Sequence, residues 1–305
     1  MKQDNKKLWT MFLILGLILI VSLIIAAFLE PGEGIINYNT AIIPVNGVIT
    51  VGESNGFFDD PVVSSTEMIK TIEKIKEDKK VKAVILEINS PGGSPVATDE
   101  ISEAVKSLKA NNITTVAWIR EVGASGAYWI ASSTDYIVAH RMSITGSIGV
   151  YGSYLEWFGL MNRYNVTYKR LVSGEYKDTG TPYRPMSYQE ETMIQKKLDK
   201  LHEYFINAVA ENRKLPVENV KELATGEIFL GIEAKEYGLV DELGSKENAL
   251  NYIELKINEK PLAKEFSKEK TLFESLMGIM SRNSFYIGKG ISSSLIKEST
   301  LTITT

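Results

Sequence analysis

The sequence predicts an α/β fold built on a largely parallel sheet. Stretches at 81–88, 114–119 and 136–139 are short, aliphatic and rich in β-branched residues, as buried strands are. Segments with helical spacing of apolar residues, at 65–78 and 96–109, alternate with these strands. Such alternation is typical of a parallel sheet with helices packed on its faces.

The composition limits the kinds of chemistry that the protein can perform. A chain of 305 residues can form one large or two modest domains with a sizeable core. A net charge of −4 gives no argument for nucleic-acid binding. The absence of cysteine excludes disulfides, thiol catalysis and cysteine-ligated zinc. The two histidines, His140 and His202, are expected to be structural, so a Ser-His-Asp triad is poorly supplied.

The N-terminal part of the sequence predicts a membrane anchor. Residues 8–29 contain no charged residue over 22 positions, and at about 1.5 Å per residue such a helix spans a hydrocarbon core of roughly 30 Å. The positive-inside rule places residues 1–7 in the cytoplasm and the chain after the span outside. The flanking charges are Lys2, Lys6 and Lys7 before the span and Glu30 and Glu33 after it.

A cleaved signal peptide is the competing interpretation of the same segment. The apolar region of a signal peptide has only about 7 to 15 residues, and residues 26–28 do not form a clear small-x-small cleavage site. We therefore expect an uncleaved anchor at 8–29, followed by a linker at 30–40.

The folded part is expected to begin with strands. Apolar residues at 41–51 predict a strand pair or one bent strand with Gly47 at the bend. The amphipathic helix at 65–78 carries charges between its apolar positions. The strand at 81–88 is apolar almost throughout, as expected of a strand covered on both faces. A helix is predicted at 125–132.

The second half is predicted to be mainly helical, with a helix at 155–164, a strand at 166–172 and a loop at 173–180. The charged helix at 187–212 begins with Ser187 and has Glu190 three residues later, the pattern of a capping box. Further helices are expected at 216–223, between the segments 226–231 and 238–244, and at 245–255. An apolar face at 271–280 precedes a Ser/Thr-rich tail at 281–305, expected to be mobile or to form an oligomer contact.

Ser125 is the candidate nucleophile, because it lies among small residues at the expected start of a helix. Free N–H groups and the positive end of the helix dipole favour the negative charge that develops when a serine attacks a carbonyl. Gly126 would allow the substrate backbone to approach closely. The alternative is that Ser125 is only a helix cap, a role that serine often fills.

The pair Gly92–Gly93 is a candidate oxyanion hole, because glycine N–H groups after a central strand can face a ligand without obstruction. An ordinary turn between strand and helix is the alternative. Neither a GxGxxG nor a GxxxxGK[ST] pattern is present here, so a dinucleotide or phosphate loop is not indicated.

Lys177 is the candidate general base, since a partly buried lysine can replace histidine beside a serine nucleophile. It lies in a glycine-containing loop after the strand predicted at 166–172. To accept a proton the amine must be neutral, which desolvation favours. Ser143 or Ser147 could hold the neutral amine by a hydrogen bond. The alternative is an exposed loop lysine.

Five motifs in this order after an N-terminal anchor resemble the short form of bacterial signal peptide peptidase A, membrane-bound Ser/Lys peptidases with a ClpP/crotonase-like fold. The resemblance covers residues 41–255. The motifs are Asn-Ser-Pro-Gly-Gly at 89–93, Ala-Ser-Gly-Ala-Tyr-Trp-Ile-Ala at 124–131, Thr-Gly-Ser-Ile-Gly-Val at 145–150, Ser-Gly-Glu-Tyr-Lys-Asp at 173–178 and Gly-Leu-Val-Asp-Glu-Leu-Gly at 238–244.

The resemblance implies a fold of repeated ββα units at 41–258, with 259–305 as an extension that it does not cover. It implies that Ser125 is the nucleophile and that Lys177 is the general base, with Ser147 holding the lysine. Either glycine of the 92–93 pair would supply one oxyanion N–H, and Gly126 another. Position 127 is alanine where many relatives have glycine, a small change that should leave the nucleophile in place.

The resemblance also implies partners and a location. Remnant signal peptides and other apolar peptides would be cleaved at the cell membrane by an extracytoplasmic domain, without a metal or other cofactor. A homo-oligomer is implied, an octameric ring in which neighbouring subunits complete each active site. Two alternatives stay open: a related peptidase with one specific membrane-protein substrate, and a non-catalytic scaffold or acyl-CoA-binding relative of the same fold.

Overall fold

The centre of the fold is a mostly parallel sheet of eight strands, seen in a computed structural model that describes residues 2–28, 37–52 and 61–267. Its strands are β1 (Thr40–Asn46), β4 (Ala83–Ser90), β5 (Thr114–Ala124), β6 (Tyr136–Ala139), β7 (Ile144–Gly146), β8 (Ile228–Leu230), β9 (Glu242–Leu243) and β10 (Ala263–Glu265). The main path runs β10-β1-β4-β5-β6-β9, with every pairing parallel. β7 pairs parallel with β5 and antiparallel with β8. The predicted α/β fold with a largely parallel sheet is confirmed.

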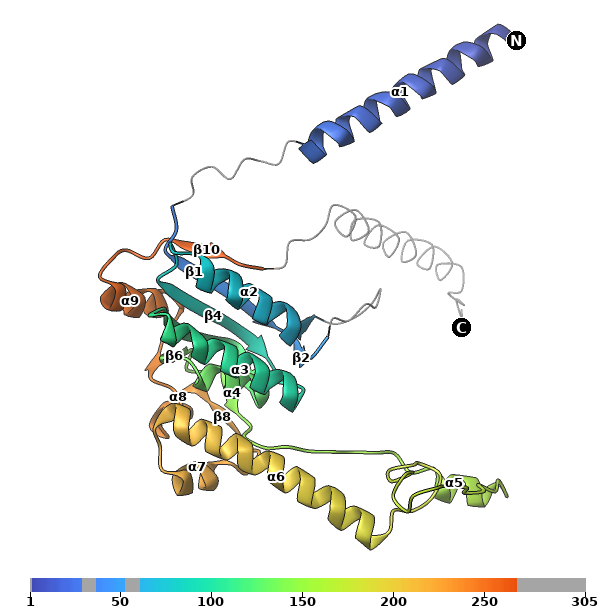
Figure 1. Cartoon of the computed structure of the whole chain (residues 1–305), viewed down its shortest axis with the longest axis vertical. Helices are drawn as coiled ribbons and strands as arrows, with labels where there is room; N and C mark the ends of the chain where they lie inside the picture. Colours follow the sequence, from blue (N-terminus) through green and yellow to red (C-terminus); the bar gives the residue numbers. More distant parts are fainter. Residues whose placement is uncertain (1, 29–36, 53–60, 268–305) are drawn as a thin grey trace, which may run out of the picture.

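Helices cover both faces of this sheet (Figure 1). Side chains alternate along β4, so that Val84, Leu86 and Ile88 belong to the larger hydrophobic core on one face of the sheet, while Ala83 and Ile85 belong to a smaller core on the other. This agrees with the strand at 81–88 predicted to be covered on both sides. The helices are α2 (Ser65–Glu77), α3 (Pro95–Ala110), α4 (Gly126–Ser132), α5 (Phe158–Arg163), α6 (Tyr188–Arg213), α7 (Val217–Leu223), α8 (Gly231–Glu236) and α9 (Lys246–Ile257).

The predicted bend at Gly47 separates β1 from β2 (Val48–Thr50), which pairs in parallel with β3 (Val62–Ser64) in a second, two-stranded sheet. Gly47 has φ of 92°, and a Cβ there would lie 1.7 Å from the carbonyl oxygen of Pro61. Only glycine fits this bend, because any side chain would collide with backbone. The bend carries β2 to the edge of the turn at residues 92–93.

The N-terminal helix α1 runs over Lys2–Phe28. Its described side chains, at positions 9–22, are almost all apolar and mostly exposed, with Trp9 at 72% and Leu13 at 69%. Within the described residues, no helix meets the length and apolar composition that a membrane crossing requires. Residue 29, the last of the predicted span, lies outside the described ranges.

Several predicted elements differ from the structure. The strand predicted at 166–172 is wrong: these residues form no regular element and are exposed, because their alternating pattern has no partner strand to pair with. The helix predicted at 155–164 is shorter, the motif at 145–150 begins within β7, and β5 runs five residues beyond 119. β10 was not predicted. The helix face at 271–280 and the tail at 281–305 lie outside the described residues.

Residues 151–187, which we call the arm, connect the sheet to α6 and contain α5. In Figure 1 the arm lies beyond the N-terminal end of α6, away from the sheet. Every one of its residues is at least partly exposed, so the arm has no hydrophobic core of its own. Long helix α6 starts at the arm with the predicted capping box of Ser187 and Glu190.

Candidate active site

A sharp turn between β5 and α4 presents the hydroxyl of Ser125. Ser125 has φ of 54° and ψ of −127°, a conformation that residues with a side chain rarely adopt. Its N–H donates to the carbonyl of Gly146 at 2.8 Å, and its own carbonyl accepts from the N–H of Tyr128 at 2.9 Å. Such a conformation costs on the order of 1–3 kcal/mol and persists only where the surroundings enforce it. The turn is therefore held from both sides.

Helix capping does not account for Ser125. It occupies the N-cap position of α4, but its side chain makes no capping hydrogen bond. Ser64, Ser94 and Ser187 hold the same position at the starts of α2, α3 and α6, and each accepts a hydrogen bond from its own helix. The hydroxyl of Ser125 thus has no role in starting α4.

The turn at Gly92–Gly93 packs directly against Ser125. Gly92 has φ of 95°, and a Cβ on it would lie 2.9 Å from Cβ of Ser125 and 2.7 Å from the nitrogen of Gly126. A Cβ on Gly93 would lie 2.1 Å from the carbonyl oxygen of Ile49 in β2. Both glycines are required by close approach of backbone to backbone. The predicted turn is therefore also the wall of the Ser125 site.

The two glycines of this turn differ in their N–H groups. Gly92 donates its N–H to the hydroxyl of Ser90 at 3.1 Å. The bridge to β2 uses the carbonyl of Gly92 and both backbone groups of Ile49, but not the N–H of Gly93. Gly126 is the first residue of α4, so its N–H has no acceptor within the helix. Gly93 and Gly126 are thus the better pair of oxyanion donors.

Ser147 lies beside Ser125 because of strand register. In the parallel pair β5 and β7, Ala124 is opposite Gly146, so the two serines follow neighbouring strand ends. The hydroxyl of Ser143, the other serine proposed to hold the lysine, is buried and donates to the carbonyls of Ile119 and Arg120. Ser147 follows the strand end next to Ser125, but neither Ser143 nor Ser147 is among the residues that line the cavity described below.

These elements border a cavity of about 820 Å³ between α3 and α6. Ser125, Gly92, Gly93 and Gly126 all line it. An aromatic wall is formed by Trp129, whose ring stacks on Phe205 with centroids 4.9 Å apart, and by Tyr151 and Tyr204. A cavity with apolar walls and a few converging polar groups is the usual form of a ligand site.

The structure does not bring Lys177 into this cavity. Lys177 lies in a turn of the arm, where its backbone N–H donates to the carbonyl of Gly174 at 3.1 Å. Its side chain is exposed. It is not among the residues that line the cavity of its own chain. Ser125 and Lys177 are therefore held by different parts of one chain.

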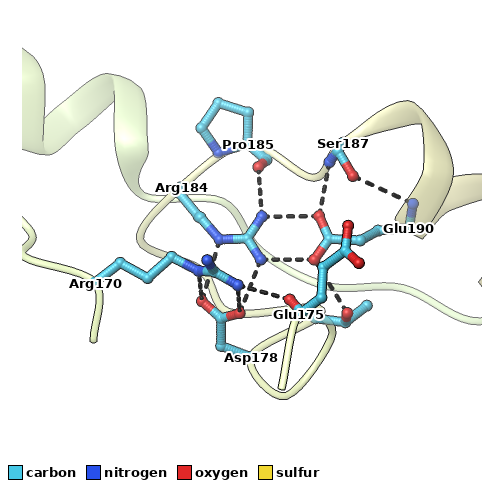
Figure 2. Close-up of polar contacts among 8 residues, drawn as sticks. Arg170, Glu175, Asp178, Arg184, Pro185, Ser187 and Glu190 are labelled. Atoms are coloured by element: carbon cyan, nitrogen blue, oxygen red, sulfur yellow. Dashed lines mark hydrogen bonds and ion pairs between the residues drawn. The ribbon is translucent and has the colours of Figure 1, made fainter. Parts of the chain in front are cut away.

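An ion cluster in the arm surrounds the turn that carries Lys177, and Figure 2 shows its members converging. Arg170 and Arg184 both pair with Asp178, and Arg184 also pairs with Glu190 on α6. Beside these guanidinium groups the pKa of each carboxyl is held well below its usual range. This cluster was not predicted from the sequence, although two arginines close to the Lys-Asp pair at 177–178 were a signal for it.

Histidine takes no part in the cavity. Neither His140 nor His202 lines it, and Nδ1 of His140 accepts the N–H of Met142 at 3.3 Å, a local contact. No group of three or more His, Asp or Glu side chains in the described ranges could hold a metal ion.

Comparison with known proteins places this sequence in a family. Residues 107–259 match Peptidase family S49. A Methanocaldococcus jannaschii protein provisionally named a protease is 35% identical over 240 residues, which are 78% of this chain and 76% of the relative. An Enterococcus faecium protein provisionally named signal peptide peptidase SppA is 38% identical over 220 residues, 72% of this chain and 64% of the relative.

Some relatives are longer, and this chain matches only part of their length. Protease 4 of Haemophilus influenzae is 31% identical over 220 residues, 72% of this chain but 35% of the relative. The part that matches the family, residues 107–259, includes the turn with the candidate nucleophile and the loop with the candidate lysine. The chain thus belongs to peptidase family S49 and is a serine peptidase.

Proposed function

We propose that this serine peptidase is a membrane-anchored endopeptidase that degrades remnant signal peptides, with Ser125 as nucleophile and Lys177 as general base. The observation that carries the proposal is the strained turn at Ser125, which leaves a hydroxyl free in an apolar cavity beside two N–H groups. The cavity walls suit the aliphatic side chains of signal peptides. The name of the Enterococcus relative supports the same substrate class.

The proposed reaction begins with neutral Lys177, which accepts the proton of Ser125 as its oxygen attacks the peptide carbonyl. The N–H groups of Gly93 and Gly126 donate to the oxyanion. The lysine ammonium then gives its proton to the leaving amine, and an acyl-enzyme remains. Water, deprotonated by the same lysine, attacks the ester, and the ammonium gives that proton to the oxygen of Ser125 as the acid leaves. Ser147 would accept a hydrogen bond from the ammonium or donate one to the neutral amine.

The lysine in each site would come from a second copy of the chain. Within one chain Lys177 lies outside the cavity, whereas the arm that carries it exposes many apolar side chains suited to contact another subunit. A closed ring, expected to be an octamer, would place each arm over a neighbouring cavity. The domain would have the ClpP/crotonase-like arrangement of ββα units that the motifs imply.

The anchor and the location are part of the proposal. Residues 8–29 carry no charge, and the lysines before them and glutamates after them favour a cytoplasmic N-terminus. The peptidase domain would then lie outside the cytoplasm at the bacterial cell membrane, where signal peptides remain after processing. Alkaline extraction of membranes tests the anchor: the full chain stays with the lipid, and a chain without residues 1–29 is released.

The test of the catalytic proposal uses the full chain in detergent and a fluorogenic peptide with small apolar residues before the cleaved bond. Ser125→Ala and Lys177→Ala should each abolish turnover. When both variants are produced in one cell, about a quarter of the sites in a mixed ring combine an intact serine with an intact lysine, so activity returns. Full activity of Ser125→Ala would exclude this serine as the nucleophile.

Two further outcomes separate the remaining possibilities. If both single variants are inactive and their mixture stays inactive, the lysine acts within its own chain. If the wild type cleaves one strict sequence and no signal peptides, the physiological substrate is a specific membrane protein.

A further inference from the structure

We propose that the ion cluster of Arg170, Asp178, Arg184 and Glu190 positions Lys177 and balances the charge around its amine. Asp178 and Arg184 would then be positioning residues of the peptidase reaction, acting through the lysine. The inference rests on the proposed role of Lys177 as general base, and it concerns how the arm makes the lysine fit for that role.

The cluster contacts residues on both sides of Lys177 in the sequence, and Figure 2 shows these contacts. Arg170 donates to both oxygens of Asp178, from Nε at 2.8 Å and from Nη2 at 2.7 Å, and Nη2 also donates to the carbonyl of Glu175 at 2.7 Å. The hydroxyl of Thr179 donates to Glu190 at 3.0 Å. The residues two before, one after and two after Lys177 are therefore fixed, while its own side chain stays exposed.

Arg184 joins this turn to α6. It donates to Asp178 from Nε at 3.2 Å and from Nη2 at 3.1 Å, and to Glu190 from Nη1 at 2.8 Å and from Nη2 at 2.6 Å. Glu190 also accepts the N–H of Ser187 at 2.8 Å in the capping box. Planar guanidinium groups favour such paired contacts, which define direction as well as distance. The position of the turn is thus set by the first turn of a 26-residue helix.

The arm is held together by ionic contacts in place of a hydrophobic core. None of residues 151–187 is buried. Glu190 is only 3% exposed, and it is the one charged residue among the buried residues of the described ranges. A buried carboxylate is tolerated only when it is paired and hydrogen-bonded. The arm therefore concentrates its strongest contacts at the turn that carries Lys177.

The cluster is also electrically balanced, with two guanidinium groups and two carboxylates. Asp178 is the sequence neighbour of Lys177, and an unpaired carboxylate there would favour the ammonium form. Its pairing with both arginines cancels that influence. The charged or titratable groups around the turn are Glu175, Tyr176 and Asp178 within it, Arg170 before it, Arg184 after it and Glu190 on α6.

The balance gives opposite effects for two substitutions. A lysine base works only when neutral, so activity rises with pH through the lysine pKa. Arg184→Gln removes a cation, which favours the ammonium form of the neighbouring amine and moves the acid limb of the pH-rate profile to higher pH. Asp178→Asn removes an anion and moves the limb to lower pH. Each shift should be roughly half a pH unit, because solvent around the exposed side chain of Lys177 screens these charges.

The experiment measures kcat and KM against pH for the full chain in detergent, with the peptide used above. Both variants should lower kcat about tenfold and change KM less than twofold, as misplacement of a catalytic group does. Arg184→Lys should return the limb to its wild-type position, because it restores the charge. Arg163→Gln, which removes an exposed arginine of the arm outside the cluster, should leave the profile unchanged.

The proposal would be overturned if the variants were less active without any movement of the acid limb, or if the acid limb moved in the same direction in both variants. The cluster would then have a purely structural role. If Arg184→Gln does not fold, Asp178→Asn, which keeps the shape of the side chain, decides the question with Arg184→Lys. Failure of the proposed function is seen separately, since Lys177→Ala would then retain activity.

Discussion

Ser125 holds a backbone conformation that is unfavourable for a residue with a side chain, and it is enforced on both sides. Its N–H is bound by the carbonyl of Gly146, and α4 starts at the next residue. Strain at a single residue of this kind is concentrated at functional sites in proteins. The serine is therefore retained here at a cost in folding stability.

This cost predicts a difference between two variants that both lack the hydroxyl. Ser125→Gly should be more stable than Ser125→Ala by about 1 kcal/mol, because glycine adopts a φ of 54° without strain. Thermal or urea unfolding of the two inactive proteins measures the difference. Equal stability would mean that the turn relaxes once the serine is replaced.

The turns around the nucleophile could be predicted from the sequence, but the hydrogen bonds of their backbone N–H groups could not. Small residues around Ser125 and the pair Gly92–Gly93 marked the turns, because close approach of backbones requires glycine. Which of the two glycine N–H groups is free could not be predicted, because it depends on the fold placing the hydroxyl of Ser90 where it accepts the N–H of Gly92. The role of Lys177 as general base remains a prediction.

Helix α6 and the arm differ in how well the sequence specifies them. The capping box of Ser187 and Glu190 fixed the start of α6 at Tyr188, as predicted. The alternating pattern at 166–172 resembled a strand, but a strand exists only where another strand satisfies its backbone. That information is not local, and the arm offers no partner. Its organisation by arginine–carboxylate pairs likewise joins residues that no periodicity links.

The ion cluster predicts an acid-sensitive arm. The pKa values of Asp178 and Glu190 lie below the usual range near about 4, so their pairing stabilises the arm above that pH and is lost progressively as the pH falls through the lowered values. Hydrogen exchange, corrected for its intrinsic pH dependence, should show faster opening of the arm below about pH 4.

Glu190→Gln provides the control for this effect. Exchange in its arm should already be faster at pH 7 and should change less on acidification, because the titrating carboxylate is gone. Peptides from β4 should stay protected in both proteins, since strand β4 is buried on both faces. An arm of the wild type that stays protected at pH 3 would contradict the prediction.

At the scale of the whole molecule, the described residues include a sheet core that holds Ser125 and an arm that holds Lys177. The core could be predicted, because hydrophobic periodicity and short connections determine a parallel α/β arrangement. β10 escaped prediction, because three residues with two charges pair only through their backbone with β1. Assembly could be inferred only from resemblance, although the exposed apolar residues of the arm agree with it.

Assembly through the arm predicts the effect of one charged substitution. Leu171 is 94% exposed in the arm, and Leu171→Asp should weaken association at least about tenfold by placing a charge in an apolar contact. Sedimentation velocity over a range of concentrations measures this. Leu255→Asp, at an 82% exposed leucine on α9, is the matched control and should assemble as the wild type does.

The separation of Ser125 from Lys177 has a consequence for when the peptidase acts. Under the proposed assembly a single newly made chain is latent, as a zymogen is, although no propeptide has to be removed. Such a chain could cross and insert into the membrane without damaging other proteins on the way. Activity would then follow the surface density of chains in the bilayer, so that proteolysis switches on collectively and falls steeply when the chains are dilute.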